Sequence, residues 1–192
     1  MKILGALLCI LFFVSCVTSF RTRHNSVYKL HEYGNSKSLS HVNKPFYFRY
    51  SIANEEINIW SNDSLHYFGE VFCYTARLDK QKRRYYGMNF QIPDSVTNKI
   101  IRKFNSLGVH KTLVEDSCSR FTTCDDCGPK EYEYSSSGHY IHRMNFSDKG
   151  YQTMDSFGNY IEQYVEANKK FNLFIDCLPH GEYQKNMVIL IK

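Results

Sequence analysis

The sequence predicts an α+β domain in which two amphipathic helices pack on one face of an antiparallel sheet built from hairpins. Three observations lead to this class. Aromatic and β-branched runs recur with short polar turns between them, two other segments follow a helical period, and the order is strands, helix, strands, helix, strands. A strand-strand-helix plan therefore occurs twice, although residue identity between the halves is too low to indicate a duplication.

The first half of the predicted domain is a run of strands. These are expected at Phe46–Ile52, Glu56–Trp60, Tyr67–Leu78 and Tyr85–Ile92. In the second run, Ile57 and Ile59 share one strand face and Asn58 lies on the other. Only Ala-Asn-Glu separates the first two runs, so they are expected to form a hairpin.

The period changes after Pro93, where Asp94 or Ser95 can cap a helix. Its expected buried face consists of Val96, Ile100, Ile101, Phe104 and Leu107, and its solvated face of Lys99, Arg102 and Lys103. Gly108 stands where a left-handed C-terminal cap belongs. A short strand is predicted next, at His110–Val114.

The second half is predicted to begin with a hairpin and to end with another. The expected elements are strands Lys130–Tyr134 and His139–Phe146, a helix beginning near Asp155, and strands Phe171–Leu178 and Met187–Ile191. The buried stripe of that helix is expected to contain Phe157, Ile161, Tyr164 and Val165.

The chain begins with the pattern of a secretory signal. Lys2 precedes an apolar run, Ile3–Val14, and small residues follow. Twelve apolar residues rise only about 18 Å as a helix, against roughly 30 Å of bilayer hydrocarbon, so a permanent span is not expected. The predicted organisation is a signal peptide at 1–15, a polar flexible tether at 16–44 and a single globular domain at 45–192.

Phe13-Val14-Ser15-Cys16 resembles the lipobox of small bacterial lipoproteins, with Phe13 in place of the usual Leu. The resemblance implies that Cys16 carries the lipid and becomes the mature N-terminus, so that the protein sits on a membrane surface in the bacterial cell envelope. Lipid anchors of this kind hold a protein at a bilayer because every buried methylene contributes about 0.8 kcal/mol. The alternative is an ordinary signal cut after Ser19, which would release a secreted soluble protein.

Composition indicates a folded domain and argues against a nucleic-acid partner. Hydrophobic residues make up 43% of the chain, charged residues 22% and aromatic residues 16%. The net charge of +5 is scattered, and no nucleic-acid-binding motif accompanies it. One dense run, Lys80–Arg84, is expected to be a solvated hairpin loop, the alternative being a contact with anionic lipid or a polyanion.

The stretch CSRFTTCDDCG holds Cys118, Cys124 and Cys127. A redox pair of Cys124 and Cys127 is disfavoured because no helix follows to stabilise a thiolate. A zinc site needs four ligands, so His139 or His142 would have to join the three cysteines of this lone C-x-x-C stretch. A disulfide between Cys118 and either Cys124 or Cys127 is therefore the favoured interpretation in an oxidising compartment.

Two further cysteines lie in apolar, strand-like runs. Cys73 and Cys177 are interpreted as core residues, or as partners of each other if their strands are neighbours. With Cys16 acylated, five cysteines remain, so one thiol is expected to be unpaired.

No catalytic or phosphate-binding motif occurs in the chain. We therefore expect a non-enzymatic binding domain, without a cofactor, whose partner is a protein or a glycan of the envelope. Fifteen tyrosines would suit such a surface, because a tyrosine ring offers a large contact area and a hydroxyl group. The alternative is a metal-dependent or thiol-redox enzyme centred on Cys118, Cys124 and Cys127, with His139 as a further ligand.

Overall fold

A computed structural model of the chain describes residues 31–33, 44–78, 84–116, 130–136, 139–144, 146–185 and 188–192. The fold is α+β, as predicted: an antiparallel sheet with helices packed on one face. The strands are β1 His31–Tyr33, β2 Phe46–Ile52, β3 Glu55–Ser61, β4 Tyr67–Arg77, β5 Arg84–Ile92, β6 Lys130–Ser136, β7 His139–Arg143, β8 Glu182–Lys185 and β9 Val188–Ile191. The helices in these ranges are α2 Asp94–Ser106, α3 Val109–Glu115, α4 Asp148–Val165 and α5 Ala167–Cys177.

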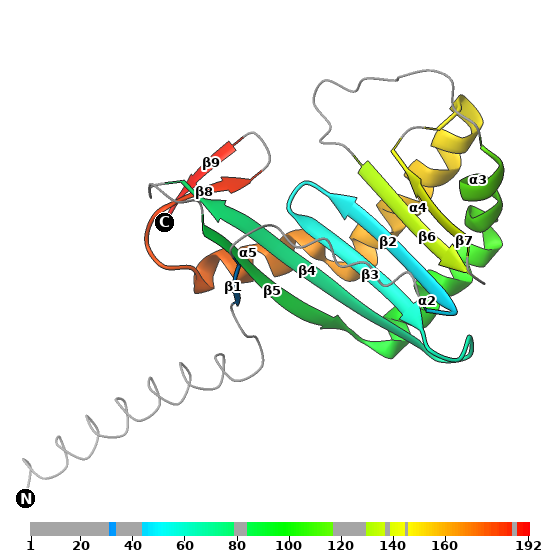
Figure 1. Ribbon diagram of the computed structural model, residues 1–192, viewed down its shortest axis with the longest axis horizontal. Coiled ribbons are helices and arrows are strands. Elements are labelled where there is room, and N and C mark those ends of the chain that lie inside the picture. The colour runs from blue at the N-terminus through cyan, green and yellow to red at the C-terminus, as the bar shows by residue number, and fades with distance from the viewer. Residues whose placement is uncertain are drawn as a thin grey trace, which may run out of the picture.

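The main path of the sheet runs β1-β5-β4-β3-β2-β6-β7, and every neighbouring pair is antiparallel. The pairing of β2 with β6 joins the two halves of the chain in one sheet. Beyond the end of β3, the last residues of β4 pair with β8, and β9 pairs with β8. In Figure 1, α2, α4 and α5 lie behind this sheet, and α3 lies at its β7 end.

The core lies between the sheet and the helices. Alternation along β2 turns Phe48 and Tyr50 toward the helices, while Tyr47 and Arg49 face the other way. The ring of Phe48 lies 5.4 Å from that of Phe104 on α2 and 5.5 Å, centroid to centroid, from that of Phe157 on α4. Such edge-on and tilted aromatic contacts add to the apolar area that the core buries.

The first predicted helix is confirmed, but the strand expected after it was wrong. Gly108 has the left-handed conformation foreseen for it, with φ 63°, and α3 starts directly beyond it. Within α3, Val109 and Leu113 are buried one turn apart, which is a helical spacing. The segment His110–Val114 therefore belongs to a second short helix.

The second half contains two helices where one was predicted. Helix α4 begins at Asp148, well before the expected start near Asp155, because Ser147 provides an N-terminal cap: its hydroxyl accepts a hydrogen bond from the Gly150 amide. Tyr164, expected on the buried stripe, is 40% exposed.

The predicted strand Phe171–Leu178 is wrong. This segment lies largely in α5, where Phe171 and Phe174 are buried three residues apart. The closing hairpin is formed instead by β8 and β9, so the last predicted strand, Met187–Ile191, is confirmed with a different partner.

A close approach between α4 and the sheet depends on Gly158. A Cβ atom at this position would lie 2.9 Å from the hydroxyl oxygen of Tyr132 and 3.1 Å from that of Tyr50. These two tyrosines stack on each other with their centroids 5.0 Å apart. A side chain at Gly158 would therefore displace the hydroxyl groups of these tyrosines or the helix itself.

Part of the predicted tether joins the sheet. Residues His31–Tyr33 pair with β5 as strand β1. The rest of the predicted signal peptide and tether up to residue 43, including Cys16, lies outside the described residues, as does most of the Lys80–Arg84 run. Among the described residues, no helix is both long and apolar enough to cross a bilayer.

Candidate functional site

The predicted cysteine site cannot be placed in the fold. Cys118, Cys124 and Cys127 lie in residues 117–129, outside the described ranges, so the disulfide and the zinc alternatives both stay predictions. Of the residues considered with them, His139 is exposed at the start of β7, and His142 follows on the same strand. In the described part of the chain, no three His, Cys, Asp or Glu side chains gather as metal ligands would.

The two other cysteines do not pair with each other. Cys73 is a fully buried free thiol on β4, as expected of a core residue, and burial raises its pKa to well above the ordinary value for a thiol. Cys177 is an exposed free thiol at the end of α5, so its interpretation as a core residue was wrong.

The sheet face opposite the helices carries a row of polar side chains, which we call the polar row. From β7 to β5 it consists of His142, Glu133, Arg49, Asn58, Glu70 and Gln91, and each residue is the cross-strand partner of the next. Side chains directly opposite each other in antiparallel strands lie about 5 Å apart and interact. The register thus brings residues from six strands into one line.

Arg49 is the centre of this row and holds two carboxylates. Its guanidinium forms a buried ion pair with Glu133 on β6, and its Nη1 lies 3.6 Å from Oε2 of Glu56 on β3. All three residues are less than 10% exposed. Taking charged groups out of water costs several kcal/mol for each ion, and one arginine between two carboxylates offsets only part of that cost.

The electrostatics of this cluster appear in the pKa of Glu56. Burial raises that pKa to about 7 and outweighs the attraction of Arg49, which lowers it. The neighbouring carboxylates of Glu133, Glu131 and Glu70 also raise the pKa, because they repel the ionised form. Desolvation alone would lower the pKa of Arg49, but Glu56 and Glu133 raise it. The cluster is therefore a fixed cation beside a carboxyl group that titrates near neutral pH. The pKa of Glu70 is also raised by burial.

Several polar atoms on this face have unused hydrogen-bonding capacity. Within the described residues, Oε2 of Glu56, Nδ2 of Asn58 and Oδ1 of Asn89 are buried without a hydrogen-bond partner. The other polar atom of the Asn58 side chain, Oδ1, accepts a hydrogen bond from the hydroxyl of Tyr47 at 3.1 Å. Most buried polar groups in proteins are paired, so three open ones on one face mark it as unusual.

A second row on the same face is aromatic. Tyr140, Tyr47, Trp60 and Phe68 occupy β7, β2, β3 and β4 in consecutive registers, with Ser135 between the first two. Tyr47 is buried, whereas Tyr140 is 44% and Phe68 is 42% exposed. Trp60 and Phe68 are stacked with centroids 6.1 Å apart. The ends of this aromatic row reach solvent beside the buried polar row.

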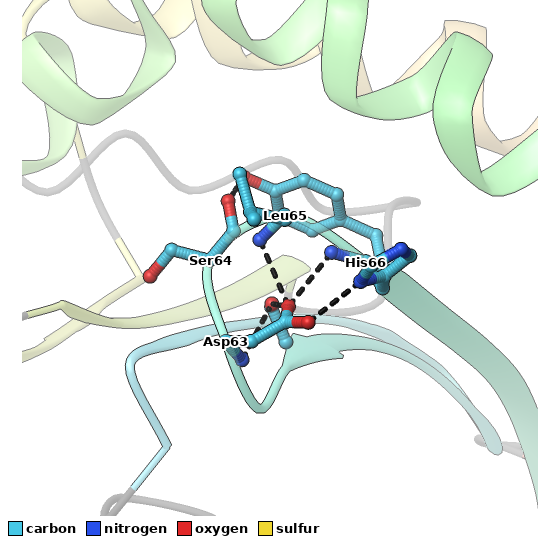
Figure 2. Close-up of polar contacts among 6 residues, drawn as sticks. Asp63, Ser64, Leu65 and His66 are labelled. Atoms are coloured by element: carbon cyan, nitrogen blue, oxygen red, sulfur yellow. Dashed lines mark hydrogen bonds and ion pairs between the residues drawn. The ribbon is translucent and has the colours of Figure 1, made fainter.

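The turn from β3 to β4 borders the aromatic row, and polar contacts around Asp63 close it, as Figure 2 shows. The Asp63 carboxylate accepts hydrogen bonds from the amides of Leu65 and His66, and its other oxygen lies 2.6 Å from Nδ1 of the His66 ring. These bonds, led by the His66 amide, lower the pKa of Asp63, and the Asp63 carboxylate raises the pKa of His66. Leu65 at the tip is 77% exposed, so the turn presents a fixed apolar side chain to solvent.

A second polar group lies on the helix side of the sheet. It surrounds a cavity of about 110 Å³ whose lining includes Glu55, Glu162 and Lys185. Nζ of Lys185 lies 3.6 Å from Glu55, and the hydroxyl of Tyr50 donates to Glu162. Glu162 accepts the hydrogen bond from Tyr50, and Oε1 of Glu55 is buried without a hydrogen bond to the described residues. The cavity lining thus holds one such atom against three on the opposite face, so the face carrying the polar row is the better candidate for a site.

Comparisons with known proteins add no relative from which a role could be transferred. No family model matches the chain, and neither a curated protein nor a solved structure gives a significant match.

Neither row was predicted from the sequence. Alternation alone places Arg49 and Tyr47 on one face of their strand, and it does the same for Glu131 and Glu133. The missing information is which strands are neighbours and in what register. A charged residue at the middle of a strongly apolar strand, as in Phe46-Tyr-Phe-Arg-Tyr, was the one signal in the sequence that could have pointed to this face.

Proposed function

We propose that this protein is an exported, lipid-anchored protein of the bacterial cell envelope and that its globular part is a non-enzymatic binding domain. The signal-like start and the lipobox-like Phe13–Cys16 support export and anchoring. The proposed binding surface is the sheet face opposite the helices, with its polar row and its aromatic row.

The observation that carries this proposal is the chemistry of that face. A sheet that only needed to fold would be expected to bear solvated polar residues there. Instead it buries Arg49, Glu56 and Glu133 at a desolvation cost and leaves Oε2 of Glu56 and Nδ2 of Asn58 without a hydrogen bond among the described residues. Departures of this kind from the ordinary folding rules concentrate at functional surfaces.

The exposed side chains of the face indicate the kind of partner. Tyr140, Phe68 and the partly exposed Trp60 provide flat apolar area, and the half-buried Glu131 provides a carboxylate at the rim. Aromatic side chains are enriched at binding surfaces because they bury a large area at a small entropy cost. A protein or glycan with hydrogen-bond donors beside an apolar patch would complement this surface.

Site-specific photo-crosslinking in intact cells tests the binding surface. A photoreactive amino acid replaces Phe68 or Tyr140 on the proposed face, and Leu173 of α5, which is 38% exposed on the helix side, serves as the matched control. We expect a discrete adduct from the first two positions and none from Leu173. Equal adducts from all three positions, or none from the proposed face, would contradict the assignment.

Intact mass of the mature protein tests the anchor separately. We expect a chain that begins at an acylated Cys16. An unmodified chain beginning at Phe20, the product of cleavage after Ser19, would show that the protein is secreted without a lipid.

Thiol and metal measurements test the non-enzymatic part of the proposal. Thiols are titrated with and without reductant, and the purified protein is analysed for zinc. Stoichiometric zinc or a reactive thiolate at Cys124 would replace the binding-domain proposal with a metal-dependent or thiol enzyme.

A further inference from the structure

Basic and aromatic side chains meet on the outward surface of α2 and α4. Nζ of Lys99 lies 5.5 Å from the ring centroid of Tyr164, and Nζ of Lys103 lies 5.5 Å from that of Tyr160. The two tyrosine rings are 4.5 Å apart. The two lysines are four residues apart on α2, and the two tyrosines are four residues apart on α4. Because the helices run antiparallel, each lysine faces one tyrosine. Arg102, exposed on the same side of α2, completes what we call the basic–aromatic patch.

No carboxylate of the described residues pairs with the cations of this patch. Among the described residues, neither Lys99, Arg102 nor Lys103 forms an ion pair. The only acidic residue of α2 is Asp94, in its first turn. The nearby Glu166 has its own partner, since its carboxylate lies 3.3 Å from Nζ of Lys169.

The neighbouring surface of α4 supplies no negative charge either. Its exposed residues beside the two rings are Ser156, Asn159 and Gln163. Three cations therefore stand together beside uncharged exposed side chains of α4. An uncompensated cluster of this kind attracts anionic partners over a distance set by salt screening.

We infer that the basic–aromatic patch docks on an anionic phospholipid surface. Three cations match a layer of phosphate groups, and tyrosine rings are favoured at the boundary between headgroups and acyl chains. This inference rests on the proposed envelope anchor, because a lipid on Cys16 would keep the domain beside a bilayer. It adds an orientation: the α2–α4 side faces the membrane and the polar row on the opposite side of the sheet faces away.

Vesicle binding by the signal-free chain, residues 17–192, tests the inference without the lipid. This chain retains every described residue. Flotation with phosphatidylcholine vesicles is compared with flotation on vesicles that also contain phosphatidylglycerol. The test variant is Lys99→Gln/Arg102→Gln. The control, Lys111→Gln/Lys149→Gln, removes the same charge from exposed lysines outside the patch and leaves the Lys169–Glu166 ion pair intact.

We expect binding only to the anionic vesicles and a decrease with added salt. Each cation near such a surface contributes about fivefold to partitioning, so the test variant should lose roughly 25-fold while the control loses far less. Circular dichroism spectra should be alike for the three proteins, since all four changed residues are exposed on helices.

Three outcomes would overturn the inference. The first is equal loss in the test and control variants, and the second is no preference for anionic vesicles. The third is patch-dependent binding to soluble polyphosphate without binding to vesicles, which would identify a soluble polyanion as the partner. None of these outcomes affects the intact-mass test at Cys16, so failure of this inference can be told apart from failure of the proposed anchor.

Discussion

The two faces of the sheet bury different kinds of side chain: apolar ones on the helix side and charged ones on the opposite side. On the helix side, Phe48, Ile57 and Val71 pack against apolar helix residues, and nearly all of the hydrophobic core lies there. On the other side, neighbouring positions of the same strands carry Arg49, Glu56 and Glu70, all buried. Because the two sets alternate along shared strands, the backbone and its hydrogen bonds are common to both. Burial on the helix side therefore stabilises the fold, whereas burial of charged groups on the other face costs stability.

The largest effect is expected from the helix side. Phe104 of α2 contacts the rings of Phe46, Phe48, Tyr134 and Phe157. Phe104→Ala should lower the free energy of unfolding by about 4 kcal/mol through lost burial and the cavity left behind. Urea unfolding measures this, with Leu173→Ala as the exposed control that should change little. Similar losses in both variants would contradict the placement of the core.

On the polar face, the expected loss comes from an unpaired charge. Arg49→Met leaves the carboxylates of Glu56 and Glu133 buried without their cation, which should cost about 3–4 kcal/mol. The triple change Arg49→Met/Glu56→Leu/Glu133→Leu removes all three charges and should regain most of that loss. If the triple variant is less stable than the single one, the cluster stabilises the fold, and the contrast between the faces is wrong.

The prediction of the structure from the sequence succeeded where local pattern was sufficient. Aromatic and β-branched runs bounded by polar turns identified β2–β5, and a period of about 3.6 identified α2. Short apolar runs were ambiguous: Val109–Leu113 and Phe171–Phe174 have helical spacing but are too short to distinguish from strands without their packing.

The polar row could not be predicted from the sequence, for a different reason. Arg49 and Glu133 are 84 positions apart, and only the pairing of β2 with β6 brings them together. Turn chemistry sets the register of neighbours within a hairpin, but nothing local specifies a pairing across half of the chain.

A pH dependence should also come from the polar face. The pKa of Glu56 is raised from 4.5 to about 7 by burial, so the folded state holds this proton more tightly than the unfolded chain. The resulting stabilisation is complete below about pH 4.5 and is lost as the pH rises to about 7, a change on the order of 3 kcal/mol. The raised pKa values of Glu55 and Glu70 act in the same direction.

Glu56→Gln isolates the contribution of this carboxyl. Unfolding free energies of the wild type and the variant are measured across that pH range, and their difference is plotted against pH. We expect the wild type to lose stability relative to the variant as the pH rises. A difference that does not vary with pH would mean that Glu56 titrates as an ordinary exposed carboxyl.

The smallest effect is expected at the exposed end of the aromatic row. Phe68 is 42% exposed, and its ring stacks on that of Trp60. Phe68→Ala should therefore cost about 1 kcal/mol or less in urea unfolding. The same variant should abolish crosslinking from Tyr140 if this row contacts the partner. A large loss of stability would instead assign Phe68 to the core.

The position of Trp60 gives the molecule a built-in optical reporter. It is the only tryptophan in the chain, and it lies on the face away from the helices, stacked on Phe68. Its emission should therefore report local changes at the aromatic row, while far-ultraviolet circular dichroism follows α2, α4 and α5. Unfolding curves from the two signals would coincide if both faces separate in one cooperative step. If a candidate partner shifts the Trp60 emission without altering the circular dichroism, it binds at that face, and the measurement needs no added label.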